Sequence, residues 1–315
     1  MRYLKDLTEG SRVGDIYLIK QRTSAVTKNG KSYLNVILQD KTGTIDAKVW
    51  DPNSAGIDDF DEKDYVEIVG DVNSFNGALQ ISVKRARKAL EGEYDPSDYL
   101  PVSSKDITAM YSELMDIIER TENVYLKKLL YAFFKEDDSF IARFKFSSAA
   151  KMVHHAFVGG LLEHTLSVTK NCIFFVAQYP KLDRDLLVTA AICHDIGKVK
   201  ELSEYPDNDY TDDGCLLGHI VMGTEMIDEK IRSIEGFPSV LASELKHCIL
   251  AHHGKYEFGS PKVPALIEAV ALNFADDLDA KMETFTELLD RSQNPKDWQG
   301  FNRLLDSNVR GTRLE

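Results

Sequence analysis

Residues 190–198, with the sequence AAICHDIGK, end an apolar helical run in two side chains that can bind metal ions. His194 and Asp195 are adjacent, and Gly197 is expected to end the helix just after them. Neighbouring residues inside an α-helix point to different faces, but at a helix end both side chains can turn toward one ion. This stretch therefore predicts a metal site at the end of a helix.

Polar strings on other apolar helical segments extend this site to both sides. GGLLEHT (159–165), GHIVMG (218–223), AHHG (251–254) and NFADDLDA (273–280) supply His164, His219, His252 and His253 and three candidate carboxylates, Asp276, Asp277 and Asp279. Imidazole with carboxylate favours Mn, Fe, Co, Ni or Zn, whereas an all-oxygen set would favour Mg or Ca. Two ions bridged by Asp195 and a hydroxide would activate water for attack on phosphorus. Each histidine alone is better explained as a core residue, but the ordered set predicts a metal centre.

The strings lie in a region that predicts an all-α domain. Apolar residues recur at helical spacing over 110–134, 140–146, 161–177, 185–194, 216–231, 240–252 and 264–279. All eight histidines of the chain lie beyond residue 150. Residues 1–90 carry 14 Lys+Arg and 13 Asp+Glu, whereas the remainder carries 24 and 38. This acidic part suits metal-binding carboxylates better than a surface that binds polyanions, although a solvated acidic helical surface would look the same.

The order His, His-Asp, His, His, Asp resembles the HD-domain superfamily of metal-dependent phosphohydrolases over about 151–281. The resemblance implies that His164, His194, Asp195 and Asp276 are core ligands, with Asp277 as the alternative to Asp276. It also implies that His219 and His252 bind a second metal, with His253 joining or replacing His252. Lys198 resembles the family lysine that contacts substrate phosphate; its alternative role is to stabilise a helix C-terminus. His155, which precedes the first string, is expected to form a hydrogen bond behind the ligands.

Residues 15–88 predict a small all-β barrel. Strands are expected at 15–19, 33–38, 44–50, 65–72 and 79–83, with Gly-bearing turns between them. The Asn-Gly dipeptide at 29–30 favours a hairpin. The string NGKSYLNVILQDKTGTIDAKVW (29–50) resembles the central strands of the oligonucleotide-binding (OB) fold. Such barrels stack bases on exposed aromatic residues while basic side chains follow the backbone.

The OB resemblance implies a nucleic-acid-binding face on the barrel. The expected residues are aromatic or basic: Tyr17, Lys28, Lys31, Tyr33, Lys48, Trp50 and Phe75. For each aromatic residue alone, a half-buried core position is the favoured alternative. The basic cluster 84–88 (KRARK) adds charge at the end of the barrel, or is simply solvated.

Length and composition predict the domain organisation. The 315 residues, 43% hydrophobic and 28% charged, are typical of globular proteins and long enough for two domains. We expect an OB-fold barrel over 1–90, a linker over 91–105, an HD-type all-α domain over 106–290 and a C-terminal tail over 291–315. In this tail, Arg291, Trp298, Phe301 and Arg303 either reach nucleic acid or a neighbouring subunit, or form a flexible end.

Cysteine spacing and hydropathy predict the compartment. The four cysteines, Cys172, Cys193, Cys215 and Cys248, form no C-x-x-C pair and suggest neither disulfides nor a zinc knuckle. The longest apolar run, 172–177, is too short to cross a membrane, and the first ten residues contain no apolar signal segment. We therefore expect a cytoplasmic protein without a membrane partner.

An OB-type barrel followed by an HD domain that opens with HHAFVGGLLEHT (154–165) is similar to one family over nearly the whole chain: the YhaM-type 3′-to-5′ exoribonucleases, also described as cmp-binding factors. This resemblance implies hydrolysis of single-stranded RNA, with single-stranded DNA as a further substrate, to nucleoside 5′-monophosphates. The expected cofactor is a pair of divalent ions, Mn before Co, Fe or Ni, with a metal-bridging hydroxide as nucleophile. Asp195 and Lys198 are then the catalytic residues, and a homo-oligomer is expected.

Two other classes of function use the same motifs. A phosphohydrolase of small nucleotides would keep the metal centre and use the barrel as a regulatory module. A non-catalytic single-strand-binding protein would use the metal only to stabilise its α domain. Comparing oligomers with mononucleotides as substrates separates these classes.

Overall fold

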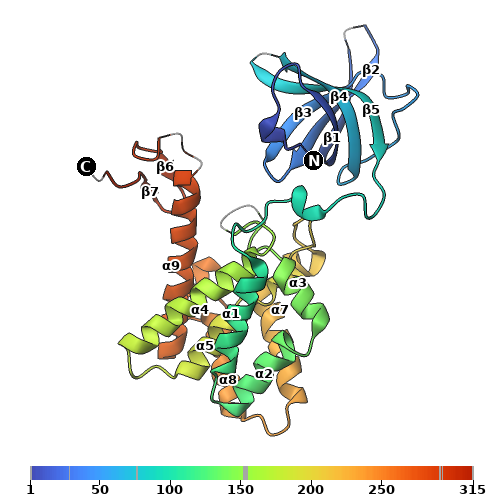
Figure 1. Cartoon of the computed structure of the whole chain (residues 1–315). Helices are drawn as coiled ribbons and strands as arrows, with labels where there is room; N and C mark the ends of the chain where they lie inside the picture. The colour runs from blue at the N-terminus through green and yellow to red at the C-terminus, as the bar shows by residue number, and fades with distance from the viewer. Residues whose placement is uncertain are drawn as a thin grey trace. The chain divides into compact units, whose positions relative to one another are not determined.

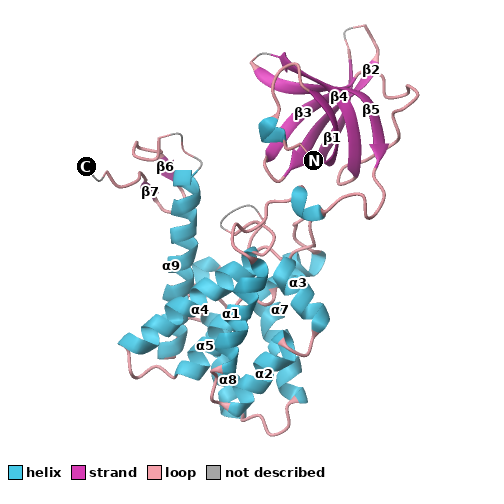
Figure 2. Ribbon diagram, in the orientation of Figure 1, coloured by secondary structure: helices cyan, strands magenta, loops and turns pink. Residues whose placement is uncertain are grey.

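The chain divides into two compact units, Met1–Val102 and Ser103–Glu315. A computed structural model describes residues 2–27, 29–75, 77–151, 155–290, 292 and 294–313. Strands dominate the first unit and helices the second (Figure 2). Within the described ranges, none of the helices combines the length and the apolar character needed to cross a membrane.

The first unit is a closed antiparallel barrel with one parallel pair. Its strands are β1 (Arg12–Val26), β2 (Ser32–Asp40), β3 (Gly43–Val49), β4 (Tyr65–Phe75) and β5 (Ala78–Lys88), in the order β1-β2-β3-β5-β4 (Figure 1). In β2, buried and half-buried residues alternate, so that Leu34, Val36 and Leu38 fill the barrel. β3 pairs with β5 in parallel, which closes the barrel. The predicted five-stranded barrel is confirmed.

The first strand is longer than predicted because it serves two partners. Residues 12–18 pair with β4, and residues 18–26 pair with β2. The register shifts between Ile19 and Gln21, and three consecutive residues, Tyr17, Leu18 and Ile19, are buried there. The alternation of inward and outward side chains therefore fails just where the strand bends.

Residues 91–102, expected as linker, pack against the barrel. Tyr94 stacks on Tyr65 of β4 with ring centroids 3.8 Å apart, and Gln39 Nε2 donates a hydrogen bond to the Tyr99 carbonyl oxygen at 3.1 Å. Tyr99 and Leu100 are buried. A short 3₁₀ helix, η2 (Pro96–Asp98), lies between Tyr94 and Tyr99. The prolines, serines and acids of this segment predict a linker, but its aromatic residues hold it against the barrel.

The second unit is all-α apart from a small C-terminal hairpin. Its helices are α1 (Ile107–Glu119), α2 (Val124–Phe134), α3 (Asp138–Phe146), α4 (Gly160–Gln178), α5 (Arg184–Cys193), α6 (Lys198–Glu201), α7 (Asp212–Ser233), α8 (Ser239–Ala251) and α9 (Ile267–Asp290). Every residue of α5 from Leu186 to Cys193 is buried, and α5 packs against α4, α8 and α9. This central helix carries the His-Asp pair to the middle of the unit.

The single helix expected over 110–134 is two helices. Asn123 begins α2, because its side chain accepts hydrogen bonds from the backbone N–H groups of Tyr125 and Leu126. The N–H groups of Glu122 and Asn123 in turn donate to Asp185 Oδ2 at 2.7 and 2.6 Å. An N-terminal cap at Asn123 thus separates α1 from α2, although the apolar residues keep helical spacing across both helices.

Candidate metal centre

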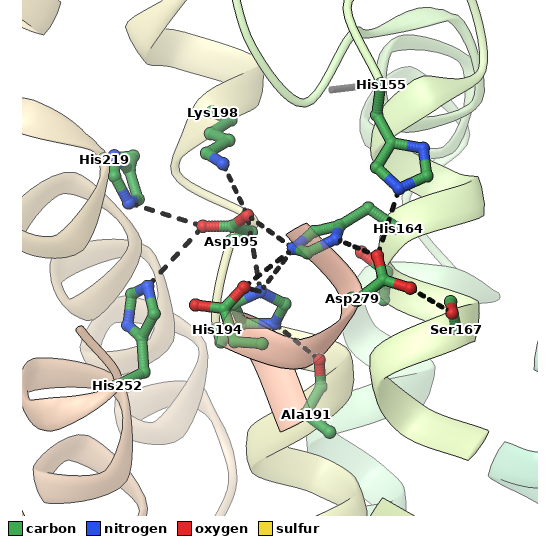
Figure 3. Close-up of polar contacts among 12 residues, drawn as sticks. His155, His164, Ser167, Ala191, His194, Asp195, Lys198, His219, His252 and Asp279 are labelled. Atoms are coloured by element: carbon green, nitrogen blue, oxygen red, sulfur yellow. Dashed lines mark hydrogen bonds and ion pairs between the residues drawn. The ribbon is translucent and has the colours of Figure 1, made fainter. Parts of the chain in front are cut away.

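The site is built around the turn that follows α5. His194 is the C-terminal cap of α5 and Asp195 lies in the turn; they are 0% and 2% exposed. His194 Nε2 lies 3.3 Å from Asp195 Oδ2, so the predicted convergence at the helix end occurs (Figure 3). Burial disfavours the charged form of Asp195, but Lys198 and His194 outweigh it and hold the pKa of this carboxyl well below its ordinary value.

One oxygen of Asp195 faces a first group of donors. His164 of α4, His194 and Asp276 of α9 place a nitrogen or oxygen within 4.8 Å of one another. His164 Nε2 lies 3.1 Å from Asp276 Oδ1 and 3.5 Å from Asp195 Oδ2. Residues far apart in sequence thus present four donors to one small volume.

The other oxygen of Asp195 faces a second group of donors. His219 of α7 and His252 and His253 at the end of α8 form this group, again within 4.8 Å. Asp195 Oδ1 lies 3.4 Å from His219 Nε2 and 3.7 Å from His252 Nε2. The carboxylate of Asp195 therefore stands between two histidine groups, one on each oxygen (Figure 3).

Two glycines bring His219 to this carboxylate. Gly218 has φ +74° inside α7, a left-handed conformation that kinks the helix just before His219. A Cβ at Gly197 would lie 2.0 Å from the His219 carbonyl oxygen and 2.7 Å from the Gly223 nitrogen. Only glycine allows the turn after Asp195 to approach α7 this closely.

All five histidines of the two groups are oriented through Nδ1. His164 donates to Asp279 (2.7 Å), His194 to the Ala191 carbonyl (2.8 Å), His219 to Glu201 (2.9 Å), His252 to the Ile249 carbonyl (2.7 Å) and His253 to the Phe258 carbonyl (2.9 Å). A carbonyl oxygen can only accept, so the proton of the neutral ring lies on Nδ1. For His194, His252 and His253, which face carbonyl oxygens, Nε2 then carries the lone pair, the arrangement typical of metal-ligating histidines.

Unpartnered buried atoms fit the donor set of a divalent ion. Among the described residues, Asp195 Oδ1, His219 Nε2 and His252 Nε2 are buried without a hydrogen-bond partner. Such orphaned groups are costly unless something compensates them. Burial and then the neighbouring His253 and His194 lower the pKa of His252, which keeps its ring neutral, as a ligand must be. A cation between Asp195 and these rings would satisfy all three atoms.

The first group also attracts positive charge. Burial alone would lower the pKa of His164, but Asp276 and Asp279 raise it to about 10. Burial likewise opposes the charge of Lys198, whereas Asp195 raises the pKa of this ammonium. Lys198 Nζ lies 2.7 Å from Asp195 Oδ2. Lys198 is the first residue of the four-residue helix α6 and follows His194, the C-terminal cap of α5, by four residues.

Three residues behind the ligands complete the site. Asp279 accepts from His164 and, through the same Oδ2, faces His155 Nε2 at 3.0 Å; Ser167 donates to its Oδ1. The structure thus gives His155 the hydrogen bond expected of it. The sequence indicates Asp279 only as one of three carboxylates in NFADDLDA and does not point to Glu201. In the structure Asp279 lies one helical turn after Asp276 and shares its face. Asp277 points elsewhere and pairs with Lys281 at 2.7 Å.

One expected nucleic-acid contact of the barrel is wrong. Tyr17 is fully buried, and its hydroxyl donates to the Arg2 carbonyl oxygen at 3.1 Å. The bend in β1 turns this ring into the core, so it cannot stack on a base.

The other described aromatic and basic candidates are accessible. Trp50 is 51% exposed and stacks on Tyr33 with centroids 5.1 Å apart. Lys48 donates to Asn35 on the neighbouring strand, and Lys31 and Phe75 are exposed. Lys28 lies outside the described residues.

The basic cluster 84–88 is largely neutralised. Lys84 pairs with Asp71, Arg87 with Glu67 and Glu93 at 2.9 Å each, and Lys88 with Asp64 at 2.7 Å. These ion pairs lie at the surface and leave little net charge for a polyanion.

Comparisons with known proteins agree with this architecture. A model of OB-fold nucleic acid binding domains matches residues 3–89, and a model of the HD domain matches residues 161–281. Among solved structures, the second OB-fold domain of replication protein A from Methanococcus maripaludis covers 30% of this chain and 98% of its own at 18% identity, with a TM-score of 0.22, too low to carry an argument.

Curated relatives match over almost the full length. The 3′-5′ exoribonuclease YhaM of Bacillus velezensis is 36% identical over 286 residues, 90% of this chain and 89% of the relative. The 3′-5′ exoribonuclease YhaM of Bacillus subtilis (strain 168) is 36% identical over 284 residues, with the same coverage. An OB fold followed by an HD domain is thus confirmed, and the chain belongs to the YhaM family of 3′-5′ exoribonucleases.

Proposed function

We propose that this chain hydrolyses single-stranded RNA from its 3′ end, releasing nucleoside 5′-monophosphates, and that single-stranded DNA is a further substrate. The barrel (1–90) would hold the strand and the helical domain (106–290) would cleave it. The observation that carries the proposal is the position of Asp195, whose two carboxylate oxygens each face a separate group of histidine Nε2 atoms.

The donor groups suggest which residues hold which ion. His164, His194, Asp195 and Asp276 would hold one divalent ion, and Asp195, His219, His252 and His253 a second. We favour His253 joining His252, because both rings present Nε2 with Nδ1 already bound to a carbonyl. Mn is the first expectation, with Co, Fe or Ni as alternatives.

Residues of this chain supply the remaining functions. Divalent ions held by these two donor groups would supply an activated water as nucleophile and positive charge for the entering and leaving oxygens. The ammonium of Lys198, which keeps its proton beside Asp195, would pair with a non-bridging oxygen of the scissile phosphate. Asp279 and Glu201 would keep His164 and His219 in the ligating orientation.

The barrel offers a stacking face without Tyr17. The Tyr33–Trp50 pair lies at the paired ends of β2 and β3, and Lys48 and Lys31 are on or beside the same strands. Stacking on such a pair tolerates any base, which suits an exonuclease. Phe75, at the end of β4, would extend the contact.

The test uses metal-stripped protein, with Mn added back, on a 5′-labelled single-stranded RNA oligomer. We expect a ladder that shortens from the 3′ end, depends on the metal, and is absent with Asp195→Asn. Asp277→Asn is the matched control, because this exposed carboxylate precedes Lys281 by one turn and lies outside both donor groups.

Two outcomes would overturn the proposal. Intact RNA together with hydrolysed mononucleotides would indicate a small-nucleotide phosphohydrolase. RNA that is bound but never shortened, by the wild type or by Asp195→Asn, would indicate a binding protein. Homo-oligomer formation and a cytoplasmic location stay predictions, and sedimentation and fractionation would measure them.

A further inference from the structure

We infer that the C-terminal hairpin, residues 294–313, is a second binding site for single-stranded RNA, on the same unit as the metal centre. The inference rests on the proposed function. In this inference, the hairpin binds the part of the RNA strand that lies several nucleotides upstream of the cleaved 3′ end.

The hairpin has a defined structure. Strands β6 (Phe301–Asn302) and β7 (Ser307–Asn308) pair antiparallel, and Gln299 N–H donates to the Val309 carbonyl at 2.8 Å. Val309 is buried, and Gly311 lies against Leu289 near the end of α9. The segment thus continues from α9, as Figure 1 shows at the end of that helix. Arg291 lies outside the described residues.

Aromatic and basic side chains share the surface of this hairpin. Trp298 and Phe301 are 66% and 61% exposed. The guanidinium of Arg310 lies 5.2 Å from the centre of the Trp298 ring, a cation–π contact. Arg303 is exposed and, in the part of the chain that the structure describes, has no ion-pair partner. Exposed rings beside guanidinium groups are what a single strand needs for stacking and for its phosphates.

Charge complementarity identifies the occupant. Residues 103–290 carry 19 Lys+Arg and 31 Asp+Glu, whereas residues 294–313 carry four and two. The hairpin is therefore a net positive segment of an otherwise acidic unit, and Lys84, Arg87 and Lys88 of the barrel's basic cluster form ion pairs. A polyanion with stackable bases fits both the positive charge and the exposed rings of the hairpin. A purely apolar partner would fit only the rings.

The length of α9 sets the distance from the metal centre. Asp276 precedes the last residue of α9, Asp290, by fourteen residues, or about 21 Å of helix. A stacked strand rises about 3.4 Å per nucleotide, so the hairpin would meet RNA roughly six nucleotides from the 3′ end. Substrates shorter than this would not reach it.

The experiment compares a long and a short substrate in the full-length chain with Mn. Trp298→Ala combined with Phe301→Ala is assayed on a 20-nucleotide single-stranded RNA and on a dinucleotide. We expect KM for the long RNA to rise about tenfold, as for the loss of base stacking, with kcat within twofold. For the dinucleotide, kcat/KM should equal that of the wild type. Phe174→Ala is the matched control, an aromatic residue of α4 with 62% exposure.

Different results contradict the inference and the proposed function. Wild-type protein that cuts neither substrate would overturn the proposed function. Wild-type cleavage with an unchanged KM in the double variant, or the same change in Phe174→Ala, would overturn the inference alone. A changed sedimentation coefficient with an unchanged KM would identify the hairpin as a contact between copies of the chain.

A second variant keeps the test independent of folding. Arg303→Gln with Arg310→Gln removes two charges and no ring. We expect the slope of log KM against log salt concentration to become shallower by one to two for the long RNA, at about 0.7 per lost phosphate contact. An unchanged slope would count against the inference.

Discussion

Asp279 accepts a 2.7 Å hydrogen bond from His164 Nδ1 and faces His155 with the same oxygen. This carboxylate orients the ring of His164, a predicted ligand, through Nδ1. We expect Asp279→Asn to weaken Mn affinity by about 10- to 100-fold, because the amide can present N–H to Nδ1 and favour the wrong tautomer. Calorimetric titration with Mn measures this. Affinity equal to that of the wild type would contradict the role.

Metal binding should also stabilise the fold. An ion that binds only the folded protein adds about 2.7 kcal/mol at a concentration 100 times its Kd. We therefore expect Tm to rise with Mn in stripped wild-type protein, and to respond much less in Asp195→Asn, which loses the carboxylate between the two groups. A Tm that rises equally in both proteins would mean that the stabilising ion binds elsewhere.

Much of the site could be predicted from the sequence, because each donor comes in a short polar string on an apolar helix. Helical periodicity also places Asp276 and Asp279, which are three residues apart, on one face of the helix. It therefore bears on both the choice of Asp276 and the role of Asp279. Glu201 could not be found in this way. It ends a helix of four residues, and only the kink at Gly218 brings His219 back beside it.

The barrel shows what could not be predicted from the sequence of its strands. Turns and alternation predict the strands, but they do not predict which rings face outward when a strand bends. In β1, three consecutive residues are buried at the bend, so Tyr17 points inward, whereas the regular pairing of β2 with β3 leaves Tyr33 and Trp50 at the surface. Bends depend on both neighbouring strands, which local sequence does not encode.

Gly197 should not tolerate even alanine. The added Cβ would lie 2.0 Å from the His219 carbonyl oxygen, so the turn and α7 must separate and carry His219 away from Asp195. We expect Gly197→Ala to destabilise the fold by about 1–3 kcal/mol and to abolish RNA cleavage. Thermal unfolding and the ladder assay measure both effects. Gly14→Ala is the control, since nothing lies within 4 Å of a Cβ at that position; equal tolerance at both sites would refute the packing argument.

Thiol reactivity should report the helical core. Burial raises the pKa of Cys193 and of Cys248 to about 12, and Cys172 is also buried, whereas Cys215 is exposed. Because the thiolate is the reactive form, alkylation at pH 8 should modify Cys215 quickly and the others only after unfolding. Mass spectrometry of the native and the denatured protein counts the modified thiols. Rapid native labelling at Cys193 would show that α5 is not the buried core helix.

The two kinds of aromatic residue on the barrel should separate binding from stability. Trp50→Ala removes an exposed ring and should weaken binding of single-stranded RNA by about 1–3 kcal/mol, with the free energy of unfolding little changed. Tyr17→Phe removes a hydroxyl that donates to the Arg2 carbonyl. It should cost about 1 kcal/mol of stability and leave binding as it is. Fluorescence anisotropy with a labelled oligomer and denaturant unfolding measure the pair. A loss of RNA affinity in Tyr17→Phe matching that in Trp50→Ala would mean that the strand lies along β1, away from the Tyr33–Trp50 stack.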